Sequence, residues 1–192
     1  RNSYEKVYDG FLKYKILRQS TGARNMPISL SYAATMDYKT VKSSDIAYLN
    51  RNWLRAYYTH QLLIARKFGE GTTVQLMPSL VHRNYVKTKA EKNDVYLIGI
   101  GARQKLSKRV AINVEYFYNL PNQLASSYVN SLSVGFDIET GGHVFQLFFT
   151  NSSGTDTRNV LTETTGKWLN GDIRFGFNVS RVFTVYNPKI KE

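Results

Sequence analysis

The three histidines are the side chains of this chain best suited to hold a metal ion or to move a proton. They are His60, His82 and His143. A metal site needs ligands that converge at a suitable spacing. His60 and His82 fall on neighbouring predicted strands and share the apolar phase of both, so they could approach each other. Histidines in a layer of surface aromatic side chains are the simpler interpretation, and we predict no metal site.

A second set, with the residue types of acyl transfer, surrounds one predicted hairpin. Ser131 and His143 lie there with two acids, Asp137 and Glu139. Acyl transfer needs all three groups near one point, and the order of these residues fits no known motif. The two acids share one strand face, where they are better placed to balance basic side chains than to act as acid and base. No phosphate-binding loop occurs either. We predict no catalytic residues, no enzyme activity and no cofactor.

Basic side chains set the overall charge of the chain. Lys and Arg number 26 against 14 Asp and Glu, which gives a formal net charge of +12. The basic residues are scattered and accompany no RNA- or DNA-binding motif, so we predict no nucleic-acid partner. Six of them fall on the polar phase of predicted strands and could line an aqueous interior: Lys13, Lys15, Arg55, Arg103, Lys105 and Arg174.

The elements that must position these residues are β-strands, because apolar and polar residues alternate with a period of two almost throughout. The 14 Tyr and 10 Phe suit pleated surfaces. We expect a single domain over residues 1–192 with no disulfide, because cysteine is absent. The alternation predicts nine strands, over residues 7–17, 27–36, 54–68, 74–83, 94–105, 109–118, 131–139, 143–150 and 171–183.

The connections between these strands alternate in length. Short connections that contain glycine, such as 140–142, alternate with longer polar ones, such as 151–170. An antiparallel meander has this pattern when its two ends face different surroundings. Bacterial outer-membrane barrels, with short periplasmic turns and longer outside loops, are the common example.

Three features favour lipid, rather than a soluble core, as the surroundings of the apolar phase. Most of the predicted strands have about 9–13 residues, enough to cross a bilayer when tilted, whereas strands of soluble domains often have about five or six. The polar phase carries many charges, and tyrosines gather toward strand ends as in an aromatic girdle. The sequence therefore predicts an all-β fold, an antiparallel up-and-down transmembrane β-barrel. A soluble barrel or sandwich is the alternative.

The loop pattern also predicts the direction of each strand. The last strand follows the longest loop, so we expect it to run inward and the C-terminus to lie in the periplasm. Counting back, the first strand would begin outside. Single-chain bacterial barrels have an even number of strands with both ends in the periplasm. We therefore expect an odd number of strands to be missing before Arg1, supplied by another segment or another chain.

Five stretches resemble a family of uncharacterised outer-membrane β-barrel proteins of the Bacteroidota, classed as a domain of unknown function. They are residues 8–22, 74–84, 92–116, 131–152 and 171–183, and the resemblance extends over nearly all of the chain. The resemblance implies roughly three further strands on the N-terminal side and about twelve in all. It implies no site residues, because that family has no established activity.

Two functions fit this architecture. The first is an integral outer-membrane protein with a structural, accessory or complex-partner role, whose partners are the bilayer, the assembly machinery and other outer-membrane proteins. Its last strand, with Phe175, Phe177, Val179 and Phe183, resembles the final aromatic strand that this machinery recognises. The alternative is a passive channel whose basic interior favours small anionic solutes.

Overall fold

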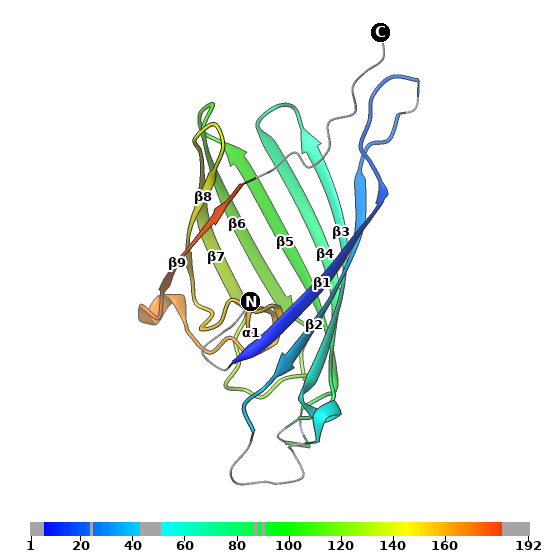
Figure 1. Ribbon diagram of the computed structural model, residues 1–192, viewed down its shortest axis with the longest axis vertical. Helices are drawn as coiled ribbons and strands as arrows, with labels where there is room; N and C mark the ends of the chain where they lie inside the picture. The colour runs from blue at the N-terminus through cyan, green and yellow to red at the C-terminus, as the bar shows by residue number, and fades with distance from the viewer. Residues whose placement is uncertain (1–5, 24, 43–50, 87, 90, 182–192) are drawn as a thin grey trace.

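The computed structural model describes residues 6–23, 25–42, 51–86, 88–89 and 91–181, and these form one curved antiparallel sheet of nine strands in sequence order (Figure 1). None of the helices described is long and apolar enough to cross a membrane. The strands are β1 Val7–Leu17, β2 Ser29–Lys39, β3 Ala56–Phe68, β4 Thr72–Arg83, β5 Asp94–Lys105, β6 Val110–Asn119, β7 Ser131–Glu139, β8 Val144–Thr150 and β9 Arg174–Ser180.

The predicted all-β antiparallel meander is confirmed, and the strand bounds differ from the prediction mainly in β2 and β9. The strand β2 extends to Lys39, whereas the alternation predicted its end at residue 36. Asp37 and Lys39 resemble loop residues, but Asp37 lies opposite Tyr57 of β3 and so belongs to the ladder. The strand β9 begins only at Arg174, because the 3-10 helix η3 (Trp168–Asn170) and Gly171, with a φ of +79°, precede it.

The pairing register keeps the two phases of the sequence on two separate faces. One row across β1–β5 joins Leu12, Ala34, His60, Leu80 and Tyr96. The rows on either side of it carry the polar phase. Because side chains alternate across a strand, this register keeps the predicted apolar phase on one face. The register shifts once, between Lys15 and Leu17 of β1. We call the apolar, convex face the outer face and the polar, concave face the inner face.

The two ends of the sheet differ in their connections. Residues 69–71, 106–109 and 140–143 are short turns at one end, where Gly69 and Gly141 have φ of +67° and +73°. The loops at the other end are longer, and that between β8 and β9 carries α1 (Thr157–Thr162). In Figure 1 the short turns are at the top and α1 is near the bottom. The connection between β1 and β2, residues 18–28, also lies at the short-turn end but is longer than these turns, so the predicted alternation of short and long connections holds from β2 onward.

The described strands form a half-barrel. Within the described part of the chain, β1 pairs with β2 alone and β9 with β8 alone. Figure 1 shows β1 and β9 on opposite sides of an opening. The outer edges of both strands therefore present backbone N–H and C=O groups without a ladder partner among the described residues.

Candidate functional site: a plugged, polar inner face

The loop between β8 and β9 folds onto the inner face through α1. This short helix contacts β2, β3, β4 and β6, which is possible because it lies on the concave side of the sheet. The side chain of Asp156 caps it by accepting a hydrogen bond from the backbone N–H of Asn159. Leu161 of α1 packs into a buried cluster of five apolar side chains on the inner face of the sheet: Met77, Val81, Val95, Leu97 and Phe117.

A buried arginine anchors α1 to the sheet. Arg158 is 1% exposed, and its backbone N–H donates to Asp37 of β2 over 3.3 Å. Its guanidinium pairs with Glu163, lies 3.6 Å from Asp156 and covers the ring of Tyr57 at 4.9 Å. A buried charge is stable only when it is paired. The helix is therefore held at one position against β2 and β3.

Further contacts fix the rest of the same loop. The amide of Asn151 donates to the carbonyl of Gly166 over 2.8 Å, and the indole N–H of Trp168 donates to the carbonyl of Leu132 over 3.0 Å. The loop between β4 and β5 adds a buried ion pair of 2.9 Å between Arg83 and Glu91. Together these segments close part of the inner face at the long-loop end.

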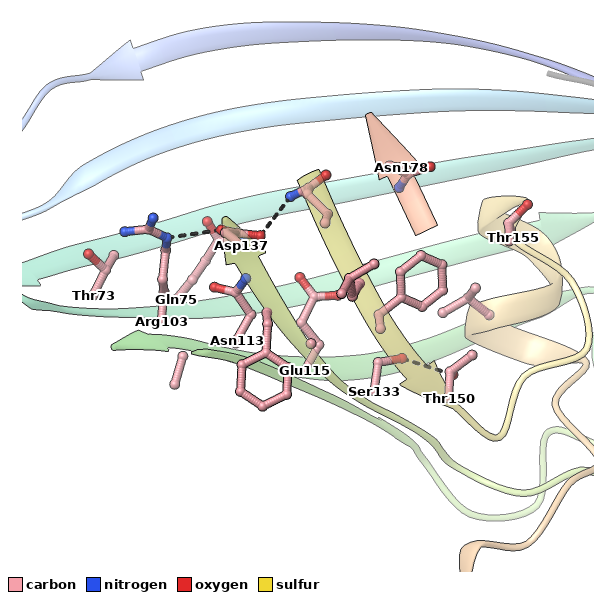
Figure 2. Close-up of a pocket in the computed structure, with 18 of the residues that line it drawn as sticks. Thr73, Gln75, Arg103, Asn113, Glu115, Ser133, Asp137, Thr150, Thr155 and Asn178 are labelled. Carbon is pink, nitrogen blue, oxygen red and sulfur yellow. Dashed lines mark hydrogen bonds and ion pairs between the residues drawn. The ribbon is translucent and has the colours of Figure 1, made fainter. Parts of the chain in front are cut away.

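A cavity of about 550 Å³ lies on the inner face beside α1. It is formed by strands β4–β9, by Thr155 and Gly154 of the loop, and by Val160 of α1. Figure 2 shows side chains from several strands projecting into this space, with Asn178 and Thr155 on its far side. The polar side chains that line it on the strands are Thr73, Gln75, Arg103, Asn113, Glu115, Ser133, Asp137, Gln146, Thr150 and Asn178.

The only guanidinium lining this cavity is offset by two carboxylates. Arg103 lies 3.2 Å from Asp137 (Figure 2). It also lies 3.3 Å from Glu139. The amide of Gln146 also donates to Asp137, over 3.0 Å. Glu115 adds a further carboxylate, for which no ion pair occurs with the described residues. The cavity therefore carries no excess of positive charge.

The structure places the other predicted basic residues in different surroundings. Lys13 and Lys15 lie on the inner-face register of β1 and are exposed. Lys105 ends β5 beside the short turns and is exposed. Arg174 begins β9 and donates to the carbonyl of Asn151 over 2.9 Å. Of the predicted basic residues, only Arg103 lines the cavity, and the others described here lie at separate places on the sheet.

Arg55 lies at the long-loop end of the sheet. It ends the 3-10 helix η2 (Asn52–Arg55) directly before β3. Its guanidinium lies 5.0 Å from the centre of the Tyr38 ring and donates to the hydroxyl of Tyr38 over 2.6 Å. Tyr38 belongs to the outer-face register, opposite Tyr8. Arg55 is thus occupied by contacts at the end of the sheet.

The histidines and the serine–histidine set are not assembled into one centre. His60 bonds Tyr32 at 2.5 Å, whereas His82 bonds Asp94 at 2.6 Å. Among the residues described, no three His, Asp or Glu side chains lie close enough to share a metal ion. Ser131 begins β7, whereas His143 follows the opposite end of that strand.

The C-terminal strand presents its aromatic side chains on the outer face. Phe175, Phe177 and Val179 are exposed and lie opposite Phe149, Leu147 and Phe145 of β8, respectively. The fourth residue of the predicted assembly signal, Phe183, lies outside the described residues.

Sequence reasoning missed the plug formed by α1 and Arg158, because it treated residues 151–170 as an open loop. One local signal was available, since Asp156 precedes the run TRNVLT and can cap a helix N-terminus. The contact of Arg158 with Asp37 had no signal, because 121 residues separate the two.

Comparison with known proteins gives one match. The family described as "Membrane bound beta barrel domain (DUF5777)" matches residues 1–183, which include every described strand. No curated protein and no solved structure matches the chain.

Proposed function

The chain belongs to the family of membrane-bound β-barrel domains of unknown function (DUF5777), and from this we propose that it is an integral outer-membrane barrel with a structural or accessory role, not an open channel. The observation that carries the proposal is the position of α1 on the inner face. The helix contacts both β2 and β6 and is anchored by buried Arg158. A segment held in this way obstructs passage along the inner face.

The charges of the inner face also favour this function over an anion channel. An anion-selective pore needs basic side chains that face the path of the ion. Arg103 and Arg158 are both paired with carboxylates, and Arg174 donates to a backbone carbonyl. The lysines Lys13, Lys15 and Lys105 remain exposed and are the observation that keeps the channel as a second candidate.

The proposal includes an orientation and partners. The short turns would face the periplasm, as in bacterial barrels generally, and the C-terminus would lie on the same side. The aromatic outer face of β9 is suited to recognition by the outer-membrane assembly machinery. Among the described strands, β1 pairs only with β2 and β9 only with β8, and a barrel in lipid must be closed because lipid offers backbone groups no hydrogen bonds. Further strands would then come from elsewhere in the protein or from another chain.

Conductance in a planar lipid bilayer tests the proposal. We expect the purified full-length protein to insert and to show no stable open state. A variant in which residues 154–165 are replaced by a short Gly-Ser linker should conduct, because it lacks α1. Steady, anion-selective conductance of the unmodified protein would instead support the channel.

A matched variant separates the plug from a general defect in folding. Lys167→Ser changes an exposed side chain of the same loop, outside α1, and should stay closed like the unmodified protein. Far-UV circular dichroism should show the same β content for all three proteins. A linker variant that folds but stays closed would contradict the role assigned to α1.

A further inference from the structure

Two glycines line the floor of the inner-face cavity. Gly101 and Gly135 lie on inner-face rows, opposite Glu115 and Asn113, respectively. A Cβ built on Gly101 would make ordinary van der Waals contact with side-chain atoms, the nearest at 3.5 Å, so a larger side chain there would have to extend into the cavity. A Cβ on Gly135 would lie 2.9 Å from the backbone carbonyl oxygen of Leu147, so glycine at this position permits the close approach of β8.

One wall of the cavity carries an aromatic ring. The tip of the Phe148 ring lies over Gly176 of the neighbouring strand, where a Cβ would approach its Cζ to 2.3 Å. The ring is therefore held close to the backbone of β9, half-buried, and also lines the cavity. Aromatic rings offer a flat apolar surface against which the C–H groups of a ligand can pack.

The remaining lining is dominated by groups that both donate and accept hydrogen bonds. Four amides reach the cavity, from Gln75, Asn113, Gln146 and Asn178, together with several hydroxyls. Each amide has an NH₂ donor beside a C=O acceptor, and each hydroxyl is both. A ligand rich in hydroxyl groups presents the same paired donors and acceptors, so this lining complements it.

The charges of the cavity argue against an anionic ligand. Arg103 is paired with Asp137 and Glu139, and Glu115 is a further carboxylate. A phosphate or carboxylate ligand would need an unpaired guanidinium or ammonium group. The volume of about 550 Å³ falls within the usual range of small-molecule sites, about 300–1,000 Å³.

From these observations we propose that the inner-face cavity beside α1 is a binding site for a neutral, polyhydroxylated solute, namely a short oligosaccharide. The amides of Asn113 and Gln146 bond its hydroxyls, and the ring of Phe148 packs against one sugar face. This goes beyond the proposed function, because binding in the cavity does not depend on whether the barrel conducts.

Isothermal titration calorimetry on the full-length protein in detergent micelles tests the inference. The probes are two neutral trisaccharides, maltotriose and triacetylchitotriose, with cationic chitotriose and anionic trigalacturonate as charged counterparts. We expect saturable binding of at least one neutral probe, at least tenfold tighter than either charged probe. Failure of both neutral probes to bind, or tighter binding of a charged one, would overturn the proposal.

Two cavity variants and one control locate the binding. Gly101→Leu fills the recess without a backbone clash and should weaken binding at least tenfold. Gln146→Leu removes one donor and one acceptor and should weaken binding by about tenfold. Ala33→Leu, on the inner face of β2 away from the cavity, should change affinity less than twofold. Equal affinity in all three variants would show that the sugar binds elsewhere and would overturn the assignment.

Discussion

Arg158 joins parts of the molecule that lie far apart in the sequence. It belongs to the loop between β8 and β9, yet it contacts Asp37 of β2 and Tyr57 of β3. Its guanidinium is also the cation that faces Asp156 and Glu163. The docking of α1 therefore combines a backbone hydrogen bond to Asp37, the contact of the buried guanidinium with Tyr57 and the apolar packing of Leu161.

Replacing this charge should release the plug while the barrel stays folded. Arg158→Met keeps an unbranched side chain but leaves the carboxylates around it without the guanidinium. Loss of one partner of a buried ion pair costs about 3–5 kcal/mol. We expect proteinase K to cleave the variant between residues 153 and 170 much faster than the unmodified protein, both in lipid vesicles.

The exposed side chain of Lys167 provides the comparison for that experiment. Lys167→Met removes a positive charge from the same loop without removing a buried pair, and its cleavage rate should match that of the unmodified protein. If Arg158→Met were equally resistant, apolar packing and the backbone hydrogen bond to Asp37 would be enough to hold α1, and the anchoring role of the Arg158 side chain would be wrong.

At the scale of the element, β9 shows how alternation separates lipid from water. Phe177 is 68% exposed on the outer face, while its neighbour Asn178 lines the inner cavity. The two residues are adjacent in the chain, but their side chains lie on opposite faces of the sheet. The same strand therefore presents both an apolar surface toward lipid and a polar surface toward the interior.

The same charge should thus have different effects at these two positions. Phe177→Arg puts a guanidinium on the lipid face, which costs about 2–4 kcal/mol near the bilayer midplane and less near the interfaces. Asn178→Arg puts it on the inner face and should cost less than about 1 kcal/mol, because the charge stays in water. Urea titration of the protein folded into vesicles measures both losses. Equal losses would contradict the assignment of the two faces.

At the scale of the whole molecule, the described residues form an open sheet whose two edge strands face an opening. Every inner pairing is antiparallel and sequential, so only β1 and β9 have a free edge among the described strands. In a bilayer such edges are costly, because lipid offers no hydrogen bonds to backbone groups. We therefore propose that further strands close the barrel between β1 and β9.

Cysteine pairs test whether further strands separate these edges in the membrane. Residues 1–192 contain no cysteine, so cysteine pairs introduced there have no background from this part of the protein. Gln146→Cys with Asn178→Cys joins register partners on β8 and β9 and should form a disulfide on oxidation. Lys13→Cys with Asn178→Cys places one cysteine on β1 and one on β9, and this pair should not form a disulfide. Efficient cross-linking of the second pair would mean that β1 and β9 lie side by side.

The sequence by itself determined the strands, the two faces and the alternation of short and long connections. Each of these is a local property, because a period of two assigns side chains to opposite faces wherever the register is unbroken. The family match to a membrane-bound barrel domain agrees with that interpretation. The positions of Phe175 and Phe177 on the outer face could be predicted for the same reason.

Only the tertiary structure decided what occupies the inner face. Whether Arg103 is a free cation depends on Asp137 and Glu139, which lie two strands away. The alternation along one strand does not reveal how close side chains of different strands come. The path of the loop that carries α1 depends on a pocket formed by β2, β3, β4 and β6 together. Curvature brings these strands around one helix, and curvature is a property of the assembled sheet, not of any single strand.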